Sequence, residues 1–165
     1  MLASALIVFR EVLEAALIVG IVLAATRGLA GRGSWISAGV GAGVIGAGLV
    51  AAFAGAISEA ASGAGQELFN AGVLLAAVVM LGWHNVWMGR HARELTAQMQ
   101  AVGDAVAAGT KPPFALAVVV GLAVLREGSE IVLFLYGIAR AGEAGAGSML
   151  AGGGLGLAAG VVAGA

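Results

Sequence analysis

The sequence predicts an all-α protein, a multi-pass bundle of transmembrane helices. Of its 165 residues, 61% are hydrophobic and only 10% are charged, and the mean hydropathy is +1.03. Such values are typical of integral membrane proteins. Apolar runs long enough, or nearly so, to cross about 30 Å of hydrocarbon lie at residues 2–25, 37–57, 68–88, 114–138 and 148–165. We therefore expect a single integral-membrane transport domain over residues 1–165.

Each run has its own character. Run 2–25 lacks a basic leader and carries three charges at its centre, so it is interpreted as a spanning helix and not as a cleaved signal peptide. Runs 37–57 and 148–165 are dense in Gly and Ala, as in closely packed membrane helices. Between the third and fourth runs, the polar stretch 89–113 is expected to form a short, separate amphipathic helix.

The connections carry charge asymmetrically. The second connection holds Glu59 and Glu67 and no basic residue. Basic residues gather instead in the first and third connections, namely Arg27, Arg32, Arg90, Arg93 and Lys111. By the positive-inside rule, these two connections face the cytoplasm. The amino terminus is then outside, and we expect the chain to lie in a cell membrane, a bacterial inner membrane.

A five-residue charge pattern occurs twice, as REVLE at Arg10–Glu14 and as REGSE at Arg126–Glu130. Each copy lies inside an apolar run, where one charged side chain costs about 3 kcal/mol on insertion scales. On a helix, the guanidinium and both carboxylates of one copy share a face. Two such faces brought together would form a polar site inside a membrane.

The two copies indicate an internal repeat. They lie 116 positions apart, and at this offset Leu6 matches Leu122 and Val8 matches Val124. The repeat unit contains three spans, and an odd unit inverts on duplication. We therefore expect a three-helix inverted repeat. A complete second unit needs a sixth span, so the chain is expected to be truncated at its carboxyl terminus.

The repeated motifs favour a cation site. Carboxylate oxygens are hard ligands that suit hard cations, and the formal charge of the two motifs together is −2. The expected metal ligands are the four glutamates, with the two arginines as supporting charges that weaken retention of the ion: Glu11, Glu14, Glu127, Glu130, Arg10 and Arg126. The alternative is that each arginine only bridges to the glutamate four residues on and locks the helices.

Several classes of function are disfavoured. The absence of Cys rules out disulfides, thiolate metal sites and protein-bound iron–sulfur clusters. A net charge of −1 provides no basic face for nucleic acid. The sequence contains no arrangement that would place a nucleophile or an activated water at depth, so an enzyme is not expected.

The motifs resemble a known family. The paired Arg-Glu-x-x-Glu helices, with the segment Gln66–Asn70 leading into Trp83 and Trp87-Met88, are similar to the high-affinity iron permeases, also called oxidase-dependent iron transporters. The chain resembles their first five transmembrane helices. The resemblance implies Fe³⁺ uptake into the cytoplasm, with iron as substrate and no permanently bound cofactor. It also implies an external iron oxidase or a periplasmic iron-delivery protein as partner.

The chain departs from this family at two positions. Asn70 replaces a common glutamate, which leaves Glu59, Gln66, Glu67 and the Asn70 carbonyl as the expected external access site. His84 replaces an apolar residue. We interpret His84 as an interfacial or packed imidazole, with an exit-side ligand or proton acceptor as the alternative.

Two further functions stay open. The chain could be a proton-coupled transporter of another divalent or heavy metal cation, because the motif by itself does not select a metal. It could also be a non-transporting membrane assembly subunit whose charges pair between helices.

Overall fold

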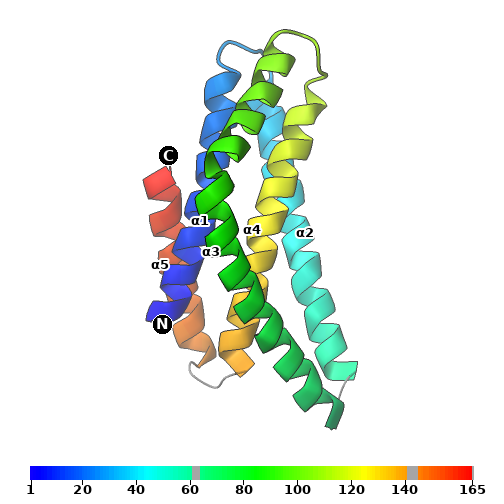
Figure 1. Ribbon diagram of the computed structural model, residues 1–165, viewed down its shortest axis with the longest axis vertical. Coiled ribbons are helices and arrows are strands. Elements are labelled where there is room, and N and C mark those ends of the chain that lie inside the picture. The colour runs from blue at the N-terminus through cyan, green and yellow to red at the C-terminus, as the bar shows by residue number, and fades with distance from the viewer. Residues whose placement is uncertain (61–63, 141–144, 165) are drawn as a thin grey trace.

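The computed structural model describes residues 1–60, 64–140 and 145–164, apart from the side chains of residues 64, 84, 85, 87–90 and 92. The described residues form helices joined by short connections, without strands, which confirms the all-α prediction (Figure 1). The helices are α1 (Leu2–Ala25), α2 (Arg32–Ala60), α3 (Ala64–Ala107), α4 (Phe114–Arg140) and α5 (Ala146–Gly164).

The helices have the length and surface of membrane-spanning segments. By length and composition, α2, the Gly65–Trp83 part of α3, and α5 can each cross a membrane. At 1.5 Å per residue, α1 and α4 are also longer than the roughly 30 Å hydrocarbon layer, although each carries three motif charges. Large apolar side chains point outward, as Phe53 and Val162 do at 72% and 80% exposure. The chain is therefore a multi-pass membrane bundle.

The helix α3 corrects one prediction. The expected separate amphipathic helix within 89–113 does not form, because α3 continues without a break for 44 residues. No proline interrupts residues 64–107, and Ala, Glu, Gln and Met favour helix propagation there. The helix ends before Gly109, whose φ of +74° suits glycine, and before the Pro112-Pro113 pair. At about 66 Å, α3 is twice as long as the hydrocarbon layer is thick.

The motif helices α1 and α4 lie at the centre and run antiparallel (Figure 1). The helix α5 packs along α1, and α2 packs along α4, whereas α3 crosses both motif helices. Each motif helix thus packs against the second helix of the other half of the chain. The two motif helices therefore have corresponding neighbours, which is consistent with the predicted inverted repeat.

Glycines allow both exchanged pairs to approach closely. On α2, a Cβ atom on Gly39 would lie 2.6 Å from the carbonyl oxygen of Ala117 in α4. On α5, a Cβ on Gly152 would collide with the carbonyl oxygen of Met1 in α1. Met1 and Ala117 lie 116 positions apart, which is the offset of the motifs. The two glycines lie 113 positions apart, so the contacts correspond between the two halves with a shift of three residues, and only glycine fits at either one.

We call these rows of glycine contacts between paired helices the glycine seams. They explain a difference between the two motifs. A Cβ on Gly160 of α5 would lie 2.8 Å from the Cβ of Val12, and a Cβ on Gly128 of α4 would lie 2.7 Å from the Cβ of Ala47 in α2. Val12 and Gly128 are equivalent positions in REVLE and REGSE. The glycine lies on α5 in one contact and on the motif helix α4 in the other, so each contact contains one glycine.

We expect Gly43→Leu to destabilise the bundle, because a Cβ there would lie 2.8 Å from the Gly121 carbonyl oxygen. The loss should be about 1–3 kcal/mol of unfolding free energy, typical of overpacking. The matched control is Gly48→Leu, on the same helix with no atom within 4 Å of the added Cβ. Denaturant unfolding in mixed micelles measures both, and equal losses would contradict the proposed seam.

Candidate metal centre

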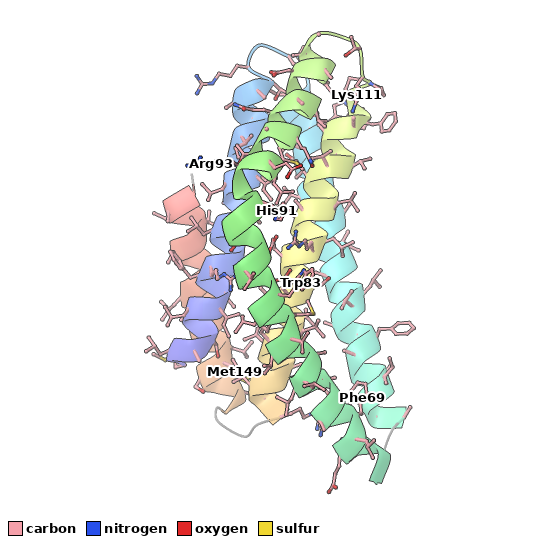
Figure 2. The ribbon with its side chains drawn as sticks, viewed as in Figure 1. Phe69, Trp83, His91, Arg93, Lys111 and Met149 are labelled. Carbon is pink, nitrogen blue, oxygen red and sulfur yellow. The ribbon has the colours of Figure 1, made fainter. Side chains whose placement is uncertain are left out.

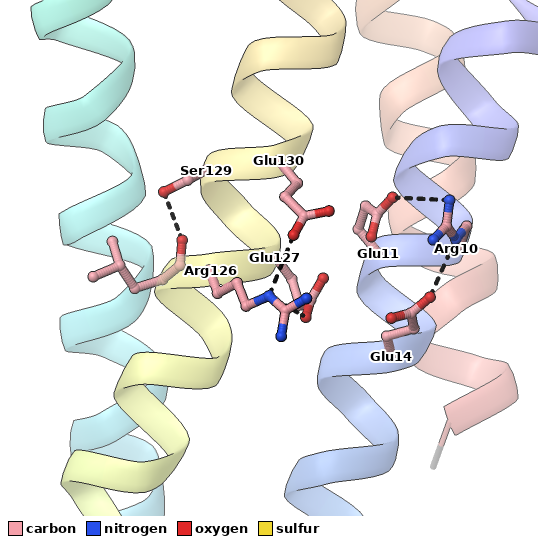
Figure 3. Close-up of polar contacts among 8 residues, drawn as sticks. Arg10, Glu11, Glu14, Arg126, Glu127, Ser129 and Glu130 are labelled. Carbon is pink, nitrogen blue, oxygen red and sulfur yellow. Dashed lines mark hydrogen bonds and ion pairs between the residues drawn. The ribbon is translucent and has the colours of Figure 1, made fainter. Parts of the chain in front are cut away.

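Antiparallel packing of α1 and α4 brings the two motifs together at mid-helix. Their carboxylate side chains point toward one another across the contact between the helices (Figure 3). One carboxylate oxygen from each of Glu11, Glu14 and Glu127 lies within 4.8 Å of the other two. Glu11 is 0% exposed and Glu127 is 3% exposed, whereas Glu14 is partly exposed. We call these three side chains the carboxylate cluster.

Each arginine contacts both glutamates of its own motif. Arg10 Nε donates to Glu14 Oε1 at 3.1 Å, and Arg10 Nη1 lies 3.9 Å from Glu11 Oε1. Arg126 Nε lies 3.3 Å from Glu130 Oε1 and 3.9 Å from Glu127 Oε1. The i to i+4 bridges of the alternative interpretation are therefore present, and the carboxylate cluster forms beside them.

The bridges leave part of the buried charge without a donor. Within the described part of the chain, neither oxygen of Glu11 has a hydrogen-bond partner, and neither does Glu127 Oε2. Burying a carboxylate without a donor is costly. A cation between α1 and α4 would remove this cost, since hard oxygen ligands are suited to it. Proton binding would remove part of it.

Glu130 differs from the other three motif glutamates. It is buried at 5% exposure and accepts from Arg126, but it does not belong to the group whose oxygens converge within 4.8 Å. The sequence predicts four metal ligands. Oxygens of three of them converge, and Glu130 lies beside them as a partner of Arg126, so the set of four stays a prediction.

The expected external access residues lie far from the cluster. Glu59 and Glu67 are exposed at the adjoining ends of α2 and α3, and Gln66 and Asn70 are half-buried there. Figure 2 shows Phe69, next to Asn70, at the end of the molecule opposite Lys111.

One side-chain contact shows how far the access residues lie from the carboxylate cluster along α4. Arg140 Nη2 donates to the buried Ser58 hydroxyl at 2.6 Å, which ties the end of α4 to the end of α2. Arg140 lies 13 residues beyond Glu127 on α4, or about 20 Å along the helix. The access residues therefore lie apart from the carboxylate cluster. The guanidinium of Arg140 lies at the same end of the molecule, which the sequence did not predict.

His84 lies within α3, but its side chain is outside the described residues. Both interpretations of this residue therefore stay predictions.

A cavity of about 510 Å³ adjoins the carboxylate cluster. Glu14, Glu127 and Arg126 line one end of it. The walls are mainly apolar and come from α1, α3 and α4, including Leu17, Ile21, Leu95, Met99, Val119 and Leu122. The amphipathic spacing of Leu95 and Met99 indicates a helix in the sequence, but only the tertiary structure shows what this face covers.

Comparison with known proteins agrees with this arrangement. The iron permease FTR1 family matches residues 1–165. The chain belongs to this family. The predicted resemblance to iron permeases is thereby confirmed at the level of the family.

Individual members of the family are about a third or more identical to the chain over the aligned residues. The ferrous iron permease EfeU of Escherichia coli O6:H1 is 38% identical over 138 residues, covering 79% of this chain and 48% of the relative. EfeU of Yersinia pestis is 34% identical over 135 residues, covering 79% and 47%. The chain thus spans about half the length of the curated relatives it matches. No solved structure gives a significant match.

Because Arg126 contacts two buried glutamates, we expect Arg126→Gln to lower the unfolding free energy by about 1–3 kcal/mol, reduced by the 42% exposure of its side chain. Adding Glu130→Gln should restore part of this loss, since one buried charge is then removed. A double-mutant cycle in mixed micelles measures the coupling. Strictly additive effects would contradict the pairing.

Proposed function

We propose that the chain forms the ion-conducting core of an iron permease that carries Fe³⁺ into the cytoplasm between α1 and α4. The observation that supports this most directly is the carboxylate cluster. Its members converge within 4.8 Å at mid-helix, and Glu11 is fully buried without a hydrogen-bond donor in the described residues. A dehydrated cation supplies the charge that such a site lacks.

The arginines make the proposed site suitable for release. An ion in the cluster competes with Arg10 for Glu14, which Arg10 already holds at 3.1 Å. The empty site therefore has a resting partner for this carboxylate, and the net gain on ion binding is smaller. Conduction requires such moderate retention, because an ion held too tightly blocks the path.

The proposed path runs from the Glu59 and Glu67 end, through the cluster, to the cavity lined by Leu17 and Met99. An external oxidase or a periplasmic iron-delivery protein would supply iron at the acidic end. With the amino terminus outside, the cavity lies on the cytoplasmic side of the cluster. An inside-negative potential then favours Fe³⁺ entering by roughly 7 kcal/mol per 100 mV, so uptake needs no second coupled ion.

Fe²⁺ is the second candidate substrate. The relatives are named ferrous iron permeases, and carboxylates also bind divalent ions. A proton-coupled transporter of another metal cation is compatible with the same donors. A purely structural role would use the Arg10–Glu14 and Arg126–Glu130 pairs, but it gives no reason to bury both oxygens of Glu11 without a hydrogen-bond donor in the described residues.

We expect Glu11→Gln, Glu14→Gln and Glu127→Gln each to reduce iron uptake by the full-length protein in proteoliposomes by about tenfold or more. The matched control is Glu94→Gln, an exposed position on α3 that should retain uptake. Parallel assays with Fe³⁺, with Fe²⁺ under ascorbate, and with Mn²⁺ identify the substrate. Full uptake in all three cluster variants would refute the proposed path.

We expect Glu67→Gln to raise the iron concentration needed for half-maximal uptake by a few-fold and to leave the maximal rate unchanged. An exposed carboxylate attracts cations to the access end but does not line the cluster. The difference from the native protein should shrink at high salt, where exposed charges are screened. A fall in the maximal rate instead would place Glu67 in the conducting step.

A further inference from the structure

We propose that the cavity beside the carboxylate cluster is a binding site for amphiphilic organic cations, of which long-chain primary alkylammonium ions are the simplest. The ammonium group would lie against Glu14 and Glu127, and the alkyl chain along the walls from α1, α3 and α4.

The cavity has the size and polarity for such a ligand. Its volume of about 510 Å³ falls in the range of roughly 300–1,000 Å³ typical of small-molecule sites. Leucine, isoleucine, valine and methionine side chains form most of the wall, and the charged groups gather at one end. An occupant therefore needs a long apolar part and one polar head.

The charge at the Glu14 and Glu127 end of the cavity determines whether a positive or a negative head group can bind there. Two carboxylates, Glu14 and Glu127, line it with one guanidinium, Arg126. Glu11 lies immediately behind, with an oxygen within 4.8 Å of both carboxylates. Arg126 is itself held by Glu130 at 3.3 Å, which leaves less of its charge for a ligand. An ammonium head would gain charge-assisted hydrogen bonds, whereas a carboxylate head would meet like charges.

The cavity can be reached from the lipid. Leu17 and Leu122 line it and are 52% and 61% exposed. Both lie within membrane-spanning helices, so an amphiphile dissolved in the bilayer can insert its chain between them. A ligand bound in the cavity would also occupy the part of the proposed iron path that runs through the cavity. This last consequence rests on the proposed function, but the binding itself does not.

A photoaffinity experiment tests the binding directly. The full-length protein in lipid nanodiscs is labelled with decylammonium carrying a terminal diazirine, and the modified residues are mapped by mass spectrometry. We expect labels on the wall residues of α1, α3 and α4, with unlabelled decylammonium protecting them at concentrations about tenfold lower than decanoate does. Labels spread evenly over the exposed faces of α2 and α5, or equal protection by decanoate, would overturn the proposal.

Cavity-filling variants provide the second arm. Ala123→Phe and Thr96→Phe, which add bulk at two different walls, should each reduce protected labelling by about tenfold. The exposed Thr96 position keeps the test valid if Ala123→Phe fails to fold. The matched control is Val162→Phe on the outer face of α5, which should label as the native protein does. Unchanged labelling in a folded cavity variant would overturn the site.

Iron uptake separates the two proposals. Block of uptake by decylammonium, relieved in Thr96→Phe, supports both the site and its position on the iron path. Specific labelling without any block supports the binding site and contradicts the proposed path through the cavity. Loss of uptake in the cluster variants together with unspecific labelling supports the permease proposal and overturns the ligand site.

Discussion

The structure depends on burying like charges between two helices in a medium without water. Glu11 and Glu127 are almost completely buried, and their carboxylate oxygens converge with that of Glu14. Such a group is tolerable only with compensating positive charge, because isolated buried carboxylates are strongly disfavoured. Arg10 and Arg126 supply part of it through contacts within their own motifs. The remainder must come from a cation or from protons, and this requirement links the fold to ion binding.

Glycine seams make this burial geometrically feasible. Helices that approach at Gly39 and Gly152 bring their backbones into contact, which bulkier side chains would prevent. Each motif helix is held in this way by the second helix of the opposite half. The two halves repeat this pairing but not the residues that make it, since Val12 faces Gly160 whereas Gly128 faces Ala47. What the two halves share is a close approach of the two helices at a glycine.

The carboxylate cluster adjoins the cavity, so a polar site at mid-helix opens directly into an apolar space. Glu14 and Glu127 belong to both, so the same carboxylates that would hold iron also line one end of the apolar cavity. Under the proposed function, ion binding would account for these charges in a member of the iron permease FTR1 family. The helix α3 completes the cavity, because its Leu95 and Met99 add to the walls that α1 and α4 form. The carboxylate cluster comes from the two motif helices, but the cavity needs α1, α3 and α4.

The sequence by itself determined the helices, the two charged faces, the repeat and the family, because apolar runs and the helical period act over a few residues. It could not separate Glu130 from Glu11, Glu14 and Glu127, since the register between α1 and α4 depends on packing between residues more than a hundred positions apart. It also indicated a break in α3, where polar composition was mistaken for a separate element. The cavity wall, the Arg140–Ser58 contact and the burial of Glu11 were decided only by tertiary structure, because each depends on how distant helices meet.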